Sequence, residues 1–251
     1  MDLSSLNEYI IARKSVRSFT GEIGEAAMED LIDFLSDLTP PQGDIDWNFD
    51  TLPYMDMVRI SAREPGVKAP HYLVLRAERK KFSLQNSGYI GEMAALWLCQ
   101  HGFASCWQGG ITINEDFPDT LPFVAALAIG KSDEPLRTGT DQFLRQPLKK
   151  TTIGDFSEWK HDVAQAVQLA PSSMNRQPVR LMSTDGKLHI FRKYVLLKNP
   201  VISYAQCIDV GVALAHIQVA AEAAGHSVSL SYRTPEPVWG NNIYQISANF
   251  D

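Results

Sequence analysis

The sequence LAPSSMNRQP, residues 169–178, contains the most distinctive pattern in the chain. Pro171 ends a helical pattern, and Ser172, Ser173 and Asn175 favour a turn in which side chains bond to nearby backbone. Such a loop offers many neutral hydrogen-bond donors and acceptors, which suits a planar heterocycle with carbonyls and ring nitrogens. An ordinary helix-to-strand loop is the alternative, and it explains the proline and serines but not the Asn-x-Gln-Pro ending at Gln177.

Two other stretches contain residues that could bind a ligand. Residues 12–19 read ARKSVRSF, where three cations and two hydroxyls within six residues suit a phosphate group. Taken alone, a solvated basic face on an N-terminal helix is the commoner meaning of such a cluster. Residues 102–110 read GFASCWQGG, where paired glycines let backbone amides approach a ligand closely. A glycine-rich exit from a buried helix is the alternative there.

Around these stretches, the periodicity of apolar residues predicts alternating helices and strands. The expected helices cover residues 25–38, 88–101, 158–169 and 209–225. The expected strands cover residues 69–75, 123–129, 179–182, 188–191 and 243–248, with a hairpin turn at 184–187. The segment 44–63 has no clear assignment. The pattern predicts an α+β fold.

The second half of the sequence resembles the first in the order of its elements. Gly88 and Gly102 bracket one apolar helix, and Gly211 and Gly225 bracket the other, each pair offset by 123 residues. The sequence therefore predicts an internal repeat. The two similar halves, residues 1–150 and 151–251, are expected to pack around a pseudo-twofold axis as one compact unit.

Composition excludes several classes of protein. The 251 residues include 23 Lys and Arg against 29 Asp and Glu, a net charge of −6, so we expect no nucleic-acid partner. The three cysteines have no metal-site or disulfide spacing, and the histidines have no metal-ligand spacing, so no metal site is predicted. We find no signal-peptide pattern at the start and no apolar run of membrane-spanning length, and expect a cytoplasmic protein without a membrane partner.

Together the motifs resemble those of the FMN-dependent nitroreductase family. Its phosphate motif, close to R-R-S-x-R-x-F, is matched by Arg13, Lys14, Ser15, Arg17 and Phe19. Its flavin loop, close to A-P-S-S-x-N-x-Q-P-W, is matched by residues 170–178, with Val179 replacing the aromatic residue. Its glycine segment, G-L-G-S-C-W-x-G-G, is matched by residues 102–110, and its basic element, near R-x-P-L, by residues 145–148.

The order of the motifs departs from that of an ordinary member, in which the loop follows the phosphate motif and two identical subunits share each flavin. Here the phosphate motif and glycine segment lie in the first half, and the intact loop lies in the second. The first half has only Thr39-Pro40-Pro41-Gln42 at the loop position. The chain therefore resembles the single-chain branch of the family, a nitroreductase-like fold with an intramolecular pseudo-dimer. We expect it to be monomeric.

The resemblance implies a role for each matched residue. Arg13, Ser15, Arg17 and Arg145 would hold the FMN phosphate, with Lys14 beside them. The backbone of Gly109 and Gly110, next to Gln108, would meet flavin N5. The loop would contact the ring system through Pro171, Ser172, Ser173 and Asn175, with Gln177 supporting it. Arg63 and Lys68 are candidates for a cation near flavin N1. No catalytic side chain is implied, because the flavin carries the chemistry.

Three functions follow from these expectations. The first is an oxidoreductase that takes a hydride from NAD(P)H and reduces a small nitroaromatic or quinone-like acceptor in alternating half-reactions. The second is a non-catalytic FMN-binding or storage protein of the same fold. The third is a structural pseudo-dimer that has lost flavin. Bleaching of a bound flavin by NADH or NADPH separates the first two, and the colour of the purified protein separates the third.

Overall fold

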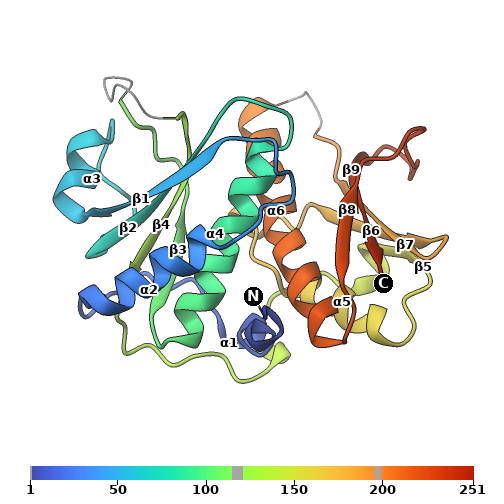
Figure 1. The fold of residues 1–251 in the computed structure, drawn as a ribbon, viewed down its shortest axis with the longest axis horizontal. Helices are drawn as coiled ribbons and strands as arrows, with labels where there is room; N and C mark the ends of the chain where they lie inside the picture. Colours follow the sequence, from blue (N-terminus) through green and yellow to red (C-terminus); the bar gives the residue numbers. More distant parts are fainter. Residues whose placement is uncertain (1, 115–120, 196–198) are drawn as a thin grey trace. The chain divides into compact units, whose positions relative to one another are not determined.

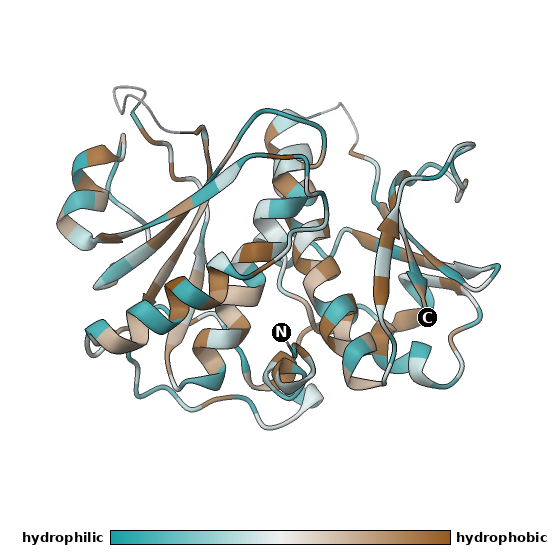
Figure 2. Cartoon of the chain, viewed as in Figure 1, coloured by the Kyte–Doolittle hydropathy of each residue, from teal (hydrophilic) through white to brown (hydrophobic). Residues whose placement is uncertain are grey.

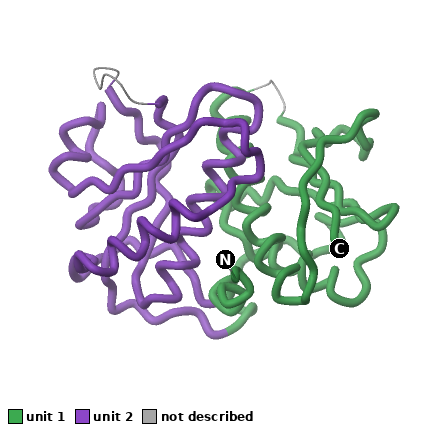
Figure 3. Tube along the Cα trace, in the orientation of Figure 1, with its two compact units in different colours: residues 1–11, 139–251 green, residues 12–138 purple. Residues whose placement is uncertain are grey.

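The computed structural model describes residues 2–114, 121–195 and 199–251, which form two compact units (Figure 3). Unit 2 is Ala12–Thr138, and unit 1 combines Met1–Ile11 with Gly139–Asp251. The sequence placed a boundary at residue 150, whereas contacts place residues 139–150 with the second half. One reason is that Arg145 Nη2 donates to the carbonyl of Leu169 at 2.9 Å. The N-terminal segment also belongs there, since the Leu3 N–H donates to Glu222 Oε2 at 3.3 Å.

Unit 2 is built on a four-stranded antiparallel sheet in the order β1-β2-β4-β3 (Figure 1). Its strands are β1 (Trp47–Pro53), β2 (His71–Ala77), β3 (Ala104–Gln108) and β4 (Phe123–Gly130). Its helices are α2 (Glu25–Ser36), α3 (Tyr54–Ile60) and α4 (Ser83–Gln100), and α1 (Tyr9–Ala12) lies at the unit boundary. Helix α4 packs against β2, β3 and β4 and is buried along almost its whole length, as its apolar composition predicts.

Helix α2 is amphipathic, with hydrophilic and hydrophobic bands visible in Figure 2. Leu31 and Leu35, four residues apart, are fully buried and lie on the face that packs toward α4. The helix ends just before the Thr39-Pro40-Pro41 segment, where proline cannot continue the hydrogen-bond ladder.

Unit 1 contains a five-stranded sheet in the order β5-β6-β7-β9-β8, antiparallel except for the pair β5–β6. Its strands are β5 (Thr152–Gly154), β6 (Val179–Thr184), β7 (Lys187–Arg192), β8 (Val228–Ser231) and β9 (Ile243–Phe250). Its helices are α5 (Trp159–Leu169) and α6 (Pro200–Ala223), with short 3-10 turns η1 (Ser4–Leu6), η2 (Thr140–Gln142), η3 (Leu148–Lys150) and η4 (Ser173–Asn175). The predicted β6–β7 turn is present, with positive φ at Asp185 (52°) and Gly186 (70°).

The two sheets share an order of strands. The antiparallel order β1-β2-β4-β3 in unit 2 recurs as β6-β7-β9-β8 in unit 1. In each unit the long buried helix, α4 or α6, connects the second strand of this order to the fourth. The described parts of the two units therefore share this order of strands and this helical connection.

Several elements differ from the expectations. The unassigned segment 44–63 contains β1 and α3, and the glycine segment contains β3. Helix α6 begins at Pro200 rather than at residue 209, because Asn199 Oδ1 accepts the Ile202 N–H at 3.2 Å and Pro200 suits the first helical turn.

By length and composition, α6 could cross a membrane, which corrects the expectation that no apolar run is long enough. More than half of its apolar window (56%) is buried within the protein, and it packs against α5, β6, β7 and β8. Its apolar character is that of a core helix.

Candidate functional site

Arg13 is the best-buried charged residue of the predicted phosphate motif, with 5% of its surface exposed. Its Nε lies 3.0 Å from Oε1 of Glu92, a fully buried residue of α4. Its Nη1 is buried and has no hydrogen-bond partner among the residues that the structure describes. A buried guanidinium nitrogen without an acceptor is costly, so this atom is suited to receive an acceptor from a ligand.

The neighbours of Arg13 are also charged. Lys14 Nζ pairs with Glu134 Oε2 at 2.9 Å, and Arg137 Nη1 donates to the Arg13 carbonyl at 2.6 Å. Arg17 is exposed. Three cations, Arg13, Lys14 and Arg137, thus lie with the two carboxylates of Glu92 and Glu134, which leaves a surplus of positive charge for an anion.

The backbone of the motif is fixed against β3. Ser15 forms a parallel bridge with Ser105, and the Val16 N–H donates to the Ser105 carbonyl at 3.1 Å. A cavity of about 100 Å³ adjoins this contact, lined by Arg13, Lys14, Ser105 and Glu134 among others. The orphaned Arg13 nitrogen, the surplus of cations and the adjoining cavity fit the phosphate of FMN.

Glu92 was missed by the sequence analysis, although it connects two of the predicted motifs. Its Oε1 pairs with Arg13, and its Oε2 accepts the indole N–H of Trp107 at 3.0 Å. Glu92 is the single charged residue in α4, and that signal was available in the sequence. Trp107 packs toward α4, where the absence of a Cβ on Gly91 makes room for its ring.

The glycine segment ends in a cluster with the loop before β2. Arg63 donates to the Gly110 carbonyl through Nη2 at 2.7 Å and Nε at 3.2 Å. Gln108 Oε1 accepts the Val67 N–H at 3.2 Å. Gly109 and Gly110 are exposed, and Gly110 has a φ of +71°. Arg63 thus lies beside the glycine pair, whereas Lys68 pairs with Glu64 at 2.8 Å on the surface.

The cysteines near this site are not activated. Burial raises the pKa of the Cys99 thiol to about 11. Burial also raises the pKa of Cys106, against the opposing effect of Arg17 and Arg13. Both thiols therefore remain protonated near neutral pH, and neither has the character of a nucleophile.

In unit 1, the loop that follows Pro171 has an unusual backbone. Met174, Asn175 and Gln177 have positive φ values of 51°, 53° and 49°. The Ser172 hydroxyl oxygen accepts the Gln177 N–H at 2.9 Å, which closes the loop on itself. Such left-handed residues persist only where surrounding contacts hold them.

Those contacts come from residues 144–146. Asn175 Oδ1 accepts from Arg145 Nη1 at 2.8 Å, and its Nδ2 donates to the Leu144 carbonyl at 3.0 Å. Gln177 Oε1 accepts the Gln146 N–H at 2.7 Å. The structure thus brings the predicted basic element together with the predicted loop. Gln177 and Arg145 both hold the loop through these contacts, and the sequence did not indicate this role for Arg145.

A second missed residue holds the loop from α6. Asp209, 6% exposed, accepts the Ser173 N–H through Oδ1 at 2.9 Å. Its Oδ2 is buried and has no hydrogen-bond partner in the described part of the chain. Burial raises the pKa of this carboxyl to about 7, and the Ser173 hydrogen bond opposes the shift. Among the described residues, no group of three or more His, Cys, Asp and Glu could hold a metal ion.

Comparison with known proteins assigns the family. Residues 5–221 match the model of the family described as "Putative TM nitroreductase", and the chain therefore belongs to that family of nitroreductases. No curated protein matches the sequence. The fold is α+β and nitroreductase-like, and the family supports an oxidoreductase function in general terms.

The fold is shared with one solved structure, the first of the three that follow. A putative nitroreductase from Thermotoga maritima has a TM-score of 0.65 at 23% identity, covering 99% of this chain and 93% of its own. An FMN-dependent nitroreductase from Clostridium difficile has a TM-score of 0.49 at 17% identity, covering 59% and 98%. A nitroreductase family protein from Clostridium novyi has a TM-score of 0.42 at 20% identity, covering 50% and 84%.

Proposed function

We propose that the protein is an FMN-dependent oxidoreductase that uses NAD(P)H to reduce a small nitroaromatic or quinone-like acceptor. The observation that carries the proposal is Arg13, whose buried Nη1 has no acceptor within the described protein and lies in a cluster with surplus positive charge. A phosphate oxygen supplies such an acceptor, and an Arg–phosphate bond is charge-assisted.

Each part of unit 2 has a task in this proposal. Arg13, Lys14 and Arg17 bind the phosphate, with the Ser15 hydroxyl as a further donor. Glu92 holds the Arg13 guanidinium through Nε and so orients its free edge. Gly109 and Gly110 present backbone amides to the isoalloxazine ring, and Arg63, fixed to the Gly110 carbonyl, supplies positive charge beside them.

The loop 171–177 of unit 1 is assigned to the same flavin on the sequence resemblance. Arg145 and Gln146 hold Asn175 and Gln177 in place, so the loop is fixed before a ligand arrives. Asn175 offers its side-chain amide, and Ser172 and Ser173 their hydroxyls. Bound FMN supplies the hydride chemistry, and the chain supplies binding, orientation and electrostatics.

The decisive experiment is an absorption spectrum of the purified protein, loaded with FMN under argon, before and after addition of NADH or NADPH. The proposal expects loss of the oxidised flavin band and its return on addition of a quinone or nitroaromatic compound. A stable yellow complex that neither nucleotide bleaches would point to a non-catalytic FMN-binding protein. A protein that binds no FMN would overturn the proposal.

The remaining expectations concern oligomeric state, cellular location and partners. We propose that the protein acts as a monomer in the cytoplasm, with small molecules rather than nucleic acid or membrane as its partners. The acidic net charge of −6 supports the absence of a nucleic-acid partner. Sedimentation of the FMN-loaded protein tests the monomeric state.

A further inference from the structure

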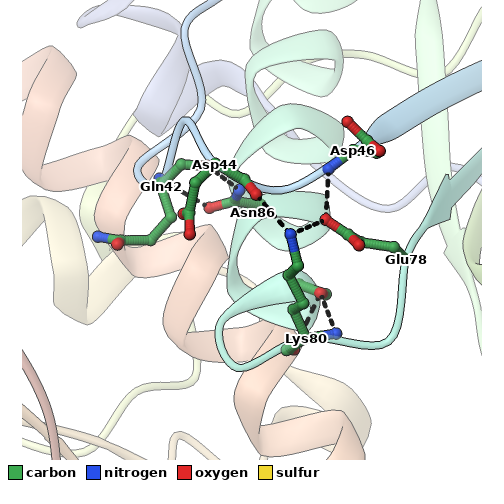
Figure 4. Close-up of polar contacts among 7 residues, drawn as sticks. Gln42, Asp44, Asp46, Glu78, Lys80 and Asn86 are labelled. Carbon is green, nitrogen blue, oxygen red and sulfur yellow. Dashed lines mark hydrogen bonds and ion pairs between the residues drawn. The ribbon is translucent and has the colours of Figure 1, made fainter.

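Corresponding loops in the two units are held by the same kind of contact. In unit 2, Asn86 on α4 accepts the Gln42 N–H through Oδ1 at 3.1 Å and donates through Nδ2 to the Gln42 carbonyl at 2.7 Å (Figure 4). In unit 1, Asp209 on α6 accepts the Ser173 N–H through Oδ1 at 2.9 Å. In each unit, a buried side chain on the long helix bonds to the backbone of a loop that follows another helix.

The surroundings of the two contacts correspond residue by residue. The held residue, Gln42 or Ser173, comes two positions after a proline, Pro40 or Pro171, and four after a buried leucine. Asn86 and Asp209 each come two positions before a glycine, Gly88 and Gly211.

The two helices also end alike. Gly102 and Gly225 follow them with φ values of +77° and +85°. The next N–H, of Phe103 or His226, bonds back to Leu98 or Ala221 at 2.8 and 2.9 Å. Asn86 and Asp209 therefore occupy equivalent positions in two copies of one helix-to-loop contact.

The copies differ in one atom. Asn86, fully buried, uses both its oxygen and its nitrogen on Gln42, whereas Asp209 has an oxygen in place of that nitrogen. This Oδ2 is buried, and no described residue forms a hydrogen bond with it. A carboxylate can only accept, but a protonated carboxyl has a donor, as an amide does. Only the protonated form of Asp209 can therefore reproduce what Asn86 does.

A small cavity beside the loop contains no charge to balance an ionised Asp209. It has a volume of about 30 Å³ and is lined by Ser172, Gln177, Gln146 and Gln168 among others. Among the described residues that line it, Asp209 is the only one with an acidic or basic side chain. An ionised carboxylate there would be desolvated and without a cation.

We propose that Asp209 is a proton-dependent positioning residue: protonated, it holds the loop 171–177 as Asn86 holds its counterpart, and ionised, it releases the loop to hydrate its carboxylate. The consequence for FMN rests on the proposed function, since that places the loop at the flavin. The hydrogen bond between Asp209 and Ser173, which we call the latch, does not depend on the proposed function.

Two effects oppose one another at this carboxyl. The Ser173 hydrogen bond favours the ionised form, and burial disfavours it. Burial is the larger effect and raises the pKa of Asp209 to about 7. At pH 8.5 the ionised form then outnumbers the protonated form about thirtyfold.

Other titratable or charged groups lie around the latch. On α6, Cys207 has a thiol pKa raised by burial, and Arg192 at the end of β7 donates to Gln206 at 3.1 Å. His216 faces α5 through the Ala166 carbonyl at 2.8 Å. Near the loop lie Arg145, bonded to Asn175 and Leu169, Arg180, bonded to the Gln177 carbonyl at 2.9 Å, and the exposed Arg176.

Hydrogen exchange of single amides in the flavin-free protein tests the latch. Between pH 6 and pH 8.5, after correction for the intrinsic exchange rate, protection of the Ser173 amide should fall at least tenfold in the wild type. In Asp209→Asn it should stay constant. The Gln42 amide is the internal control and should be constant in the wild type, and Asn86→Asp should make it pH-dependent. Equal pH profiles at Ser173 in wild type and Asp209→Asn would overturn the proposal.

A measurement on the wild type alone tests the latch even if a substitution prevents folding. A carbonyl-carbon NMR titration of the wild type should show Asp209 titrating near pH 7 together with the Ser173 amide. Titration of Asp209 in the ordinary range of aspartate would overturn the latch.

The FMN dissociation constant separates the latch from the proposed function. If the loop meets the flavin, FMN affinity should fall above pH 7 in the wild type more than in Asp209→Asn. A working latch at Ser173 with identical pH profiles of FMN affinity in the two proteins would support the latch and overturn its role at the flavin.

Discussion

Arg13 has two roles, and substitutions at Arg13 and Glu92 separate them. It neutralises the buried carboxylate of Glu92, and it offers Nη1 to an anion. Arg13→Ala alone removes the cation that pairs with the buried Glu92 carboxylate, which costs about 3–5 kcal/mol of stability. The double variant Arg13→Ala with Glu92→Gln removes both charges, and its FMN dissociation constant should rise roughly tenfold to a hundredfold, at 1.4 kcal/mol per decade.

Fluorescence titration of FMN measures this effect. Glu92→Gln alone should bind FMN at least as well as wild type, because it removes a carboxylate from the anion site. Arg79→Ala, an exposed cation of the same unit, is the control and should leave affinity unchanged. Wild-type affinity in a folded double variant would place the phosphate elsewhere.

At Asp209 the raised pKa has a consequence for global stability. Because the folded protein holds this proton up to about pH 7 and an unfolded aspartate loses it near pH 4, the stabilisation is complete below pH 4 and lost as pH rises to 7. The stability of the wild type should fall relative to Asp209→Asn by at most about 1.4 kcal/mol per pH unit across this window. Urea denaturation of both proteins from pH 4 to pH 8 measures the difference, and parallel curves would contradict the prediction.

At the scale of elements, sequence periodicity predicted those whose character is local. Helices α2, α4 and α5 and the β6–β7 hairpin were predicted because apolar spacing and an Asp-Gly turn are features of neighbouring residues. Strand β3 is absent from the strands that the sequence predicts, because it is five residues long between glycines and its strand character depends on pairing with β4. Strand β1 is mostly half-buried and has no clear alternation of burial.

The candidate site divides in the same way. Its motif residues could be predicted because they are contiguous, at residues 13–17, 108–110 and 171–177. Their partners Glu92 and Asp209 could not, because each lies on a helix far away in the sequence, and the pairing exists only after tertiary packing. A lone charge in an apolar helix, as Glu92 is in α4, was the available signal.

The contact between α4 and β3 leads to a prediction about Gly91. A Cβ at this position would lie 2.4 Å from the Trp107 ring and 2.8 Å from Leu75. Gly91→Ala should therefore displace the indole, weaken its bond to Glu92 and cost about 1–3 kcal/mol. Thermal denaturation and tryptophan fluorescence measure both effects. Gly66→Ala, at an exposed glycine with open space around it, is the control; equal stability of the two variants would contradict this packing.

The loop after α5 gives another prediction. Asn175→Ala removes the acceptor of Arg145 and the donor to Leu144, and places alanine at a φ of +53°, which costs about 1–2 kcal/mol. If the loop meets the flavin, the absorption band shape and reduction potential of bound FMN should change. Arg176→Ala, at the exposed next residue, should change neither. An unchanged spectrum, potential and turnover in Asn175→Ala would mean that the loop lies away from the flavin.

Over the whole molecule, related topologies have kept different binding features. Unit 2 has the cationic cluster of Arg13 and Lys14, but its loop after α2 is Thr39-Pro40-Pro41-Gln42, without the serines and asparagine of its counterpart. Unit 1 has the intact loop at 171–177, and its sequence contains no second copy of the Arg13-x-Ser15 motif. One device, the helix-to-loop contact of Asn86 and Asp209, remains in both.

This division predicts one FMN per chain. A complete set of phosphate ligands and loop residues can be assembled once from the sequence, since each kind occurs once. Each charge-assisted bond to the phosphate contributes roughly 1.5–3 kcal/mol, so a set lacking Arg13 and Lys14 should not retain FMN at micromolar concentration. Flavin released from a known amount of saturated protein, measured by absorbance, should give a ratio of one. A ratio of two would mean that unit 1 contains phosphate ligands that its sequence does not reveal, and Arg13→Ala with Glu92→Gln would then weaken one of the two sites and leave the other at wild-type affinity.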